Sequence, residues 1–240
     1  MKKILALNLK MNFDYKDIKN YVVALNDNLK ASDIIVLPPM LFLPYFISQN
    51  YKIGAQNISE FDNGAYTGEV SCSQLKSIGV AYALIGHSER RQYQCENDDK
   101  INSKIKKALE NGLKVIFCIG ETKEEREMLK TSKVLKKEIV DGLKGIDENN
   151  LKNVIIAYEP IWSIGTGIIP TNKDIVDTTK FIIDTAVKVF NYKPKVLYGG
   201  SVNEKNIAEL NKINEISGFL VGGASLDVKK VLKMKEVVEK

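Results

Sequence analysis

A few short stretches of this 240-residue chain carry side chains that could transfer protons or bind an anion. Lys10 follows an apolar stretch near the start, His87 is the only histidine, and Glu159 ends an apolar stretch in the second half. Two glycine pairs, Gly199-Gly200 and Gly222-Gly223, follow two later apolar stretches. A carboxylate base, a neutral imidazole, an ammonium group and a backbone able to approach a phosphate together suit proton transfer beside a carbonyl.

Each of these residues also has an ordinary structural interpretation. A lone histidine is often part of a core, a lysine beside a strand is often only solvated, and a buried carboxylate can be half of an ion pair. A glycine pair can be no more than a tight turn. The chemical interpretation therefore depends on whether the fold brings these residues together.

Apolar, β-branched segments alternate with helical patterns along the whole chain, without a linker or low-complexity tract. The segments are almost continuously apolar, which is typical of parallel strands buried on both faces. Eight of them alternating with helices predict one α/β domain over residues 1–240, a closed (β/α)8 barrel. The predicted strands are Ile4–Asn8, Ile34–Leu37, Ile53–Gln56, Tyr82–Ile85, Lys114–Cys118, Val154–Tyr158, Lys195–Tyr198 and Gly218–Val221. The predicted helices include Tyr15–Lys30, Asp98–Asn111, Lys123–Leu143, Asn172–Phe190, Val202–Asn211 and Leu226–Glu239.

In such a barrel, the residues that follow the strands converge on one face, where barrel enzymes build their sites. The candidate catalytic and phosphate-binding residues come at the ends of strands one, four, six, seven and eight. They are Asn8, Lys10, His87, Glu159, Ser201, Gly222 and Gly223. The loops after strands seven and eight are where barrels bind phosphate through backbone N–H groups. A site built from all of them is therefore expected.

The surroundings of two residues predict their protonation. A helix that begins near Ser88 would lower the pKa of His87 and favour a neutral ring, with one nitrogen accepting backbone N–H groups. Partial desolvation would raise the pKa of Glu159 towards neutrality, which suits a base that abstracts a proton from carbon.

Composition excludes several other classes of protein. The net charge of +5 comes from lysines scattered among glutamates, which is typical of solvated helix faces and not of nucleic-acid binding. No run approaches the roughly 18 apolar residues of a membrane span, and the N-terminal apolar stretch is too short for a signal peptide. Cys72, Cys95 and Cys118 lack metal-binding spacing, so we expect free thiols in a reducing cytoplasm, and neither metal nor cofactor.

Five motifs together resemble the triosephosphate isomerase family, in order and at similar spacing, over essentially the whole chain. They are Leu9-Lys10-Met11-Asn12, Gly86-His87-Ser88-Glu89-Arg90-Arg91, Tyr158–Gly167, Tyr198-Gly199-Gly200-Ser201-Val202 and Val221-Gly222-Gly223-Ala224-Ser225-Leu226. The resemblance implies a cofactor-free isomerase of glycolysis and gluconeogenesis, which interconverts dihydroxyacetone phosphate and D-glyceraldehyde 3-phosphate.

The resemblance also implies a role for individual residues. Glu159 would move the proton between C1 and C2, and His87 would polarise the carbonyl and shuttle protons between O1 and O2. Lys10 and Asn8 would lie beside it, and Glu89 would be an acid next to the site or part of a structural ion pair. The expected phosphate donors are Gly165, Ser201, Gly222 and Gly223. A closing lid is expected over Ile161–Thr171, with its core residues Pro160, Ile161, Trp162, Ser163, Ile164, Gly165, Thr166 and Gly167.

One long connection, from Asn57 to Cys72, shows little periodicity, and loops of that length are usually functional. Its segment Tyr66-Thr67-Gly68-Glu69-Val70-Ser71 resembles the one by which each subunit of the family's homodimer reaches into the other. It would cover Met11 of the partner, and Glu69 would pair with Arg90 across the interface. Arginine occurs only at positions 90, 91 and 126, which marks Arg90 as a residue with a specific partner.

The sequence departs from the family's pattern at a few positions. Leu7 and Leu9 stand where glycine and tryptophan are usual, and Ser163 where alanine is usual. After Gly167 the chain reads Ile168-Ile169-Pro170-Thr171, without the usual lysine. Because proline restricts the residue before it, the lid hinge is expected to differ while the catalytic assignments stand.

Other phosphate-binding barrels are the competing interpretations. A Schiff-base lyase would need a lysine late in a strand, whereas Lys114 and Lys195 stand at strand starts. A metal-dependent epimerase would need several histidines. A non-catalytic binding protein on this fold should lack Lys10, His87 or Glu159, and all three are present.

Overall fold

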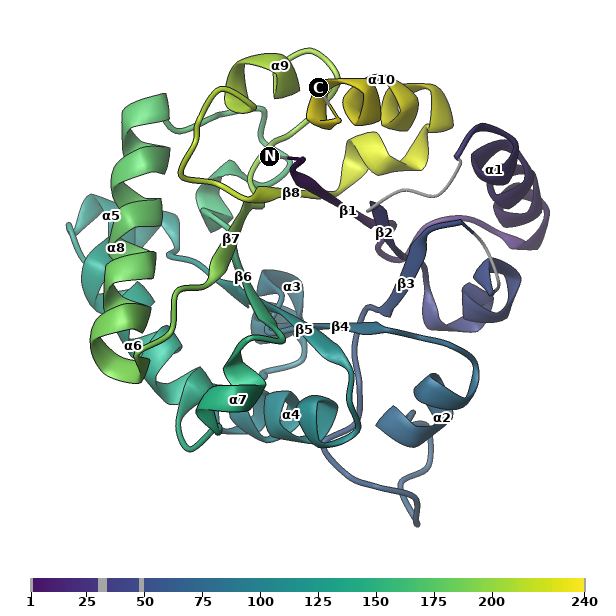
Figure 1. The fold of residues 1–240 in the computed structure, drawn as a ribbon, viewed down its shortest axis with the longest axis horizontal. Coiled ribbons are helices and arrows are strands. Elements are labelled where there is room, and N and C mark those ends of the chain that lie inside the picture. The colour runs from purple at the N-terminus through teal and green to yellow at the C-terminus, as the bar shows by residue number, and fades with distance from the viewer. Residues whose placement is uncertain (1, 30–33, 48–49, 240) are drawn as a thin grey trace.

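A computed structural model describes residues 2–29, 34–47 and 50–239, which form a closed barrel of eight parallel strands in sequence order (Figure 1). The fold class predicted from the sequence is confirmed. The strands are β1 (Ile4–Asn8), β2 (Ile34–Leu37), β3 (Lys52–Ala55), β4 (Tyr82–Ile85), β5 (Lys114–Ile119), β6 (Val154–Tyr158), β7 (Lys195–Tyr198) and β8 (Gly218–Val221). Six have the predicted bounds; β3 lies one residue earlier and β5 is one residue longer than predicted.

Helices surround the barrel on all sides (Figure 1). The α-helices are α1 (Tyr15–Asn28), α2 (Cys72–Ser77), α3 (Ser88–Tyr93), α4 (Asp98–Glu110), α5 (Lys123–Glu127), α6 (Thr131–Leu143), α7 (Glu148–Leu151), α8 (Asn172–Phe190), α9 (Ile207–Leu210) and α10 (Val228–Val238). Short 3-10 helices are η1 (Met40–Phe46), η2 (Ile161–Ser163) and η3 (Gly223–Leu226).

Two predicted helices were wrong in extent. The predicted helix Lys123–Leu143 is two helices, because Leu129 between them adopts a left-handed backbone with φ 56°. The predicted helix Val202–Asn211 is reduced to the single turn of α9, since Asn203 and Asn206 bond the backbone of the preceding loop instead. The predicted end of the first helix, Lys30, lies outside the described residues.

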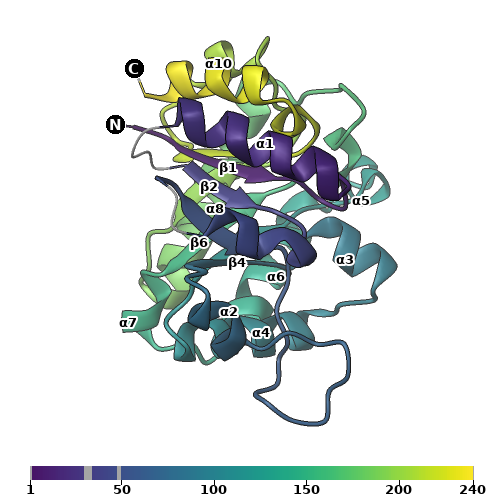
Figure 2. The same ribbon diagram turned by 90° about the vertical axis from the view of Figure 1, so that its right-hand side faces the viewer.

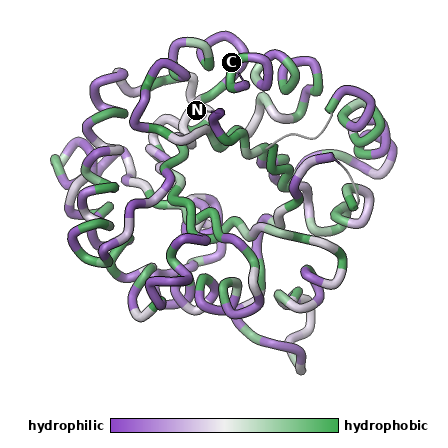
Figure 3. Tube along the Cα trace, viewed as in Figure 1, coloured by the Kyte–Doolittle hydropathy of each residue, from purple (hydrophilic) through white to green (hydrophobic). Residues whose placement is uncertain are grey.

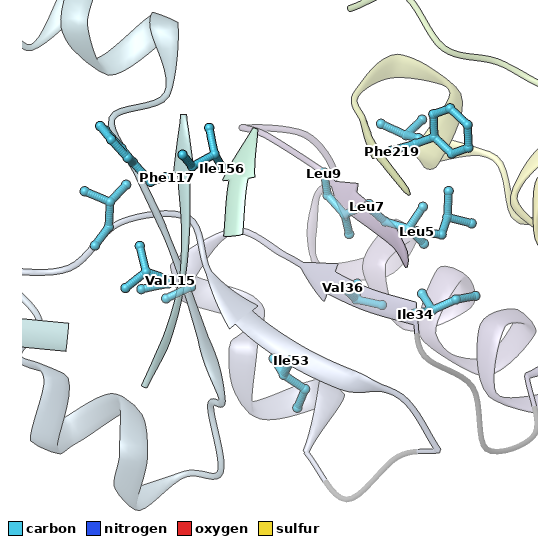
Figure 4. Close-up of a cluster of buried hydrophobic side chains, with 14 of the residues drawn as sticks. Leu5, Leu7, Leu9, Ile34, Val36, Ile53, Val115, Phe117, Ile156 and Phe219 are labelled. Carbon is cyan, nitrogen blue, oxygen red and sulfur yellow. The ribbon is translucent and has the colours of Figure 1, made fainter. Parts of the chain in front are cut away.

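Alternating side chains along the strands build two apolar layers. Those that point to the axis fill the barrel, among them Ala6, Leu84, Ile116 and Leu197. Those that point outwards pack beneath the helices, and Figure 4 shows part of this outer cluster, with Leu5, Leu7, Val115, Phe117 and Phe219 among the labelled residues. Figure 3 shows the same arrangement as hydrophobic strands inside more polar helices. This double burial explains why the strands read as continuous apolar runs.

The connection that was expected to be irregular is so from residue 57 to residue 71, and it projects away from the barrel (Figure 2). It is nevertheless ordered by contacts of its own. The Ser59 N–H donates to the Val70 carbonyl at 2.9 Å, and the Phe61 and Tyr66 rings stack with centroids 4.2 Å apart. Ser71 then starts α2 with a capping box that includes Gln74. The loop therefore holds its shape through its own contacts while it extends away from the barrel.

Candidate active site

The residues expected to do chemistry converge at the carboxyl ends of the strands. Asn8 and Lys10 from β1, His87 from β4 and Glu159 from β6 line one cavity of about 90 Å³. Three predicted phosphate donors, Gly165, Gly222 and Gly223, line the same cavity. The expected lid residue Ile164 and the glycine pair Gly199-Gly200 also line it, and Val202 and Leu220 are lining residues that the sequence did not indicate as site residues.

The His87 side chain begins α3, as expected from the sequence. Its Nδ1 accepts the backbone N–H of Glu89 at 3.3 Å, so this nitrogen carries no proton in the neutral ring. Nε2 then carries the proton, and it lies 3.1 Å from Oε1 of Glu159. The ring is 5% exposed. The helix start thus selects the tautomer that presents an N–H group to the cavity.

Glu159 lies directly against His87 in this substrate-free structure. The carboxylate is only 2% exposed, and its Oε2 accepts the backbone N–H of Ser88 at 3.2 Å. A Cβ atom at Gly199 would come within 3.0 Å of the Glu159 side chain. Glycine at that position therefore leaves room for the carboxylate, which gives the first glycine pair a function besides a turn.

The expected pKa directions of this pair were wrong for the substrate-free enzyme. Burial lowers the pKa of His87, but the adjacent Glu159 carboxylate raises it, and the net direction is upward. Burial raises the pKa of Glu159, but His87 and the Ser88 N–H lower it, and the net direction is downward. The expected directions apply to each group in isolation, whereas the fold makes each the other's closest charged partner.

The single histidine makes this coupling measurable. We expect a pH titration of the His87 ring, followed by nitrogen NMR of the untagged protein, to have its midpoint above the usual histidine pKa of about 6.5. In Glu159→Gln the carboxylate is gone and burial dominates, so the midpoint should fall below about 6.5. Equal midpoints in the two proteins would contradict the direct contact between the ring and the carboxylate.

Lys10 is held at the mouth of the cavity by a strained backbone. Its φ is 51°, in the left-handed region that non-glycine residues avoid. Asn8 Oδ1 accepts the Lys10 backbone N–H at 3.0 Å, and Gln56 Nε2 donates to the Lys10 carbonyl at 2.9 Å. The ammonium lies 2.6 Å from Glu89 Oε1. Lys10 is thus fixed by its neighbours, which argues against a merely solvated side chain.

The turn after β8 brings its backbone close to this ammonium. Gly222 precedes the 3-10 helix η3, and a Cβ atom there would lie 3.2 Å from Cε of Lys10. Ser225 Oγ donates to the carbonyls of Gly222 and Asn8, which fastens the turn to the end of β1. A lysine and an N–H-rich turn side by side form a setting for a phosphate.

Comparison with known proteins agrees with this geometry. The sequence profile of the triosephosphate isomerase family matches residues 3–238. The triosephosphate isomerase of Thermodesulfovibrio yellowstonii is 40% identical, across 97% of this chain and 98% of its own length. That of Neurospora crassa is 42% identical, across 91% of this chain and 92% of its own length. The chain belongs to the triosephosphate isomerase family. Its members interconvert dihydroxyacetone phosphate and D-glyceraldehyde 3-phosphate, and this chain is such an enzyme.

The segment that is expected to form the lid is held by contacts at Trp162 and Ser163. Trp162 Nε1 donates to Oε1 of Glu121 at 3.0 Å, and the Arg126 guanidinium lies 4.4 Å from the Trp162 ring centroid. Ser163 Oγ donates to the Ile168 carbonyl at 2.6 Å, which closes the lid backbone on itself. Gly165 and Gly167 have φ of 70° and 76°, and glycine is needed for both.

Ser201 contacts the expected lid segment and does not line the 90 Å³ cavity in this structure. Its Oγ donates to the Ser163 carbonyl at 2.6 Å. Its predicted contact with phosphate therefore stays a prediction, whereas its contact with the lid base is observed. The alanine-to-serine departure at position 163 has a visible effect, since the hydroxyl group makes the bond to Ile168.

The residues expected at a subunit interface surround a second, wider hollow of about 690 Å³ beside Lys10. Met11, Glu69 and Arg90 line it, and Met11 is 95% exposed. Within the chain, Arg90 Nε is bonded to Glu96 at 2.8 Å, a partner that the sequence analysis missed. Thr67 and Tyr66 lie on the projecting loop, and the Glu69–Arg90 contact across two subunits stays a prediction.

Proposed function

We propose that Glu159 is the base that carries the proton between C1 and C2 of the triose phosphate, with His87 and Lys10 acting on the oxygens. The observation that supports this most strongly is the position of Glu159 and His87 in one small cavity, with Nε2 3.1 Å from Oε1. The pairing of a carboxylate base with an imidazole that stays neutral during turnover is the established chemistry of this family.

The proton steps follow from the hydrogen bonds already described. Substrate would displace Glu159 from Nε2, and the carboxylate would then take the proton from C1. The N–H of Nε2 would donate to the carbonyl oxygen, and the Lys10 ammonium would stabilise the negative charge that develops there. Glu159 would return the proton to C2, after His87 has moved a proton between the two oxygens. Loss of the Glu159 carboxylate contact would lower the pKa of His87, which keeps the ring neutral during turnover.

The phosphate would lie against the glycine turns. Gly165, Gly222 and Gly223 line the same cavity as His87, and Ser201 would join them when the lid shifts. A coupled assay with D-glyceraldehyde 3-phosphate tests the activity, and inhibition by inorganic phosphate tests the anion site separately. A Schiff-base lyase is disfavoured because Lys114 and Lys195 begin β5 and β7, at the opposite end of the barrel.

We also propose a homodimer that works in the cytoplasm, in glycolysis and gluconeogenesis. Among the described residues, no helix is long and apolar enough to cross a membrane. The projecting loop and the nearly fully exposed Met11 support an interface, since a large exposed apolar side chain beside a preformed loop is typical of a contact surface. The partner's loop would fill the 690 Å³ hollow beside Lys10.

Sedimentation tests the dimer. The wild-type protein should sediment near twice 26.9 kDa. Thr67→Arg with Glu69→Arg should give monomers of low activity, because each loop would support the other subunit's Lys10. Ser132→Arg with Glu236→Arg, at exposed positions of α6 and α10, is the matched control and should stay dimeric. Fully active monomers of the loop variant would show that the loop is dispensable.

Trp162 should report lid movement, since it is the only tryptophan and its indole contacts Glu121 and Arg126. Saturation with phosphoglycolate, which carries a phosphate and a carboxylate in place of the enediolate, should change its emission under red-edge excitation. An unchanged spectrum at saturation would indicate that the lid does not move, with Ile168–Pro170 holding it in place.

A further inference from the structure

The opposite end of the barrel from the active site holds a third hollow, of about 350 Å³. Six of its thirteen lining residues are lysines, and none is an aspartate or glutamate. They are Lys2, Lys52, Lys114, Lys152, Lys193 and Lys195. Such a density of one sign of charge in a concave site creates a strong positive potential.

The barrel itself directs three of these lysines towards its axis. Lys52, Lys114 and Lys195 are the first residues of β3, β5 and β7, which lie at alternate positions around the barrel (Figure 1). Side chains alternate along a strand, and the residues two further along β5 and β7, Ile116 and Leu197, fill the barrel interior. In this fold, the side chains that fill one layer of the barrel interior come from alternate strands, and most of them are branched apolar residues. Here three lysines stand in that layer.

Contacts within the hollow agree with this direction. Lys114 Nζ lies 5.8 Å from the ring centroid of Tyr82, which belongs to the interior cluster. For the part of the chain that the structure describes, no carboxylate lies within 4.0 Å of the ammonium groups of Lys2, Lys114, Lys152, Lys193 or Lys195. Among the described residues outside the hollow, some lysines do have such partners, for example Lys104 with Glu96 and Lys137 with Asp141. Like charges without a carboxylate partner, such as these five, disfavour the folded state when they lie around one hollow.

We propose that this hollow binds a small polyphosphate anion, held by lysines from several strands at once. Ammonium groups bind phosphate as point charges, so several of them around a hollow suit several linked phosphates better than one. The inference is independent of the catalytic assignments. Val154, the first residue of β6, lines this hollow, and Glu159 comes directly after the last residue of β6. The length of the strand therefore separates the two sites by roughly 16 Å.

Calorimetric titration of the whole enzyme with inorganic tripolyphosphate tests the proposal, with the active site first saturated with phosphoglycolate. One further binding event is expected, weaker at higher salt, together with a rise in Tm because the anion binds only the folded state. In Lys114→Gln with Lys195→Gln, the affinity should fall about tenfold or more, since two charge-assisted contacts are lost.

The matched control is Lys133→Gln with Lys136→Gln, which removes the same charge from the exposed face of α6. It should keep wild-type affinity, and all three proteins should keep the same kcat. Without anion, the Lys114/Lys195 variant should also melt higher than wild type because repulsion is relieved. Equal binding by both variants, or no second binding event at physiological salt, would overturn the proposal. So would tighter binding of a single-stranded oligonucleotide than of tripolyphosphate.

Discussion

Glu159→Gln should lower kcat by on the order of 10³- to 10⁴-fold, because the amide cannot accept the proton from carbon. The side chain is buried and contacts His87 and the Ser88 N–H, and an amide of the same shape can occupy that space. Steady-state kinetics with D-glyceraldehyde 3-phosphate measure the loss, and a thermal melt shows whether the fold is kept. Phosphoglycolate should still bind, since the glycine turns are unaltered.

Glu138→Gln is a suitable control for that variant. Glu138 is a second buried carboxylate, whose burial raises its pKa to about 7, and it accepts the Gly120 N–H outside the cavity. Its replacement should leave turnover within an order of magnitude of wild type. Near-normal turnover of Glu159→Gln would remove the proposed base from the mechanism.

Lys10→Ala should lower kcat/KM by about 10²- to 10³-fold, the usual cost of removing one donor that stabilises a developing oxyanion. The ammonium lies between Glu89 and the Gly222 turn, so the variant should also bind inorganic phosphate more weakly as a competitive inhibitor. Lys16→Ala, on the exposed face of α1, is the matched control and should change neither quantity. Unchanged phosphate inhibition in Lys10→Ala would show that the ammonium does not contact the anion.

Much of the fold could be predicted from the sequence because the barrel strands are buried on both faces. A strand such as Val154–Tyr158 is a continuous run of apolar residues because both of its faces are buried. The residue that follows such a strand lies at the carboxyl end of the barrel, where the active site is built. The positions of Lys10, His87 and Glu159 at this end of the barrel could therefore be predicted from the strands that precede them. The start of α3 at Ser88 also agreed, because the preceding strand fixes where the helix can begin.

The parts that sequence reasoning missed depend on contacts between strands. Nothing near Gln56 in the sequence indicates that its amide donates to the Lys10 carbonyl, 46 positions away. The opposed pKa shifts of His87 and Glu159 arise only when β4 and β6 bring the two groups within 3.1 Å. The one available signal for Gln56 was a polar residue directly after a buried strand. The lysines at strand starts were visible in the sequence, but their shared direction required the closed barrel.

The most direct test of the central claim follows isomerisation in D₂O by NMR, with the purified enzyme and dihydroxyacetone phosphate. If Glu159 carries the proton, its protonated carboxyl can exchange with solvent before returning a hydrogen to C2. The account predicts D-glyceraldehyde 3-phosphate with deuterium at C2, formed by the wild-type enzyme and almost absent with Glu159→Gln. Product that forms equally well with Glu159→Gln, with the same deuterium content at C2, would contradict it.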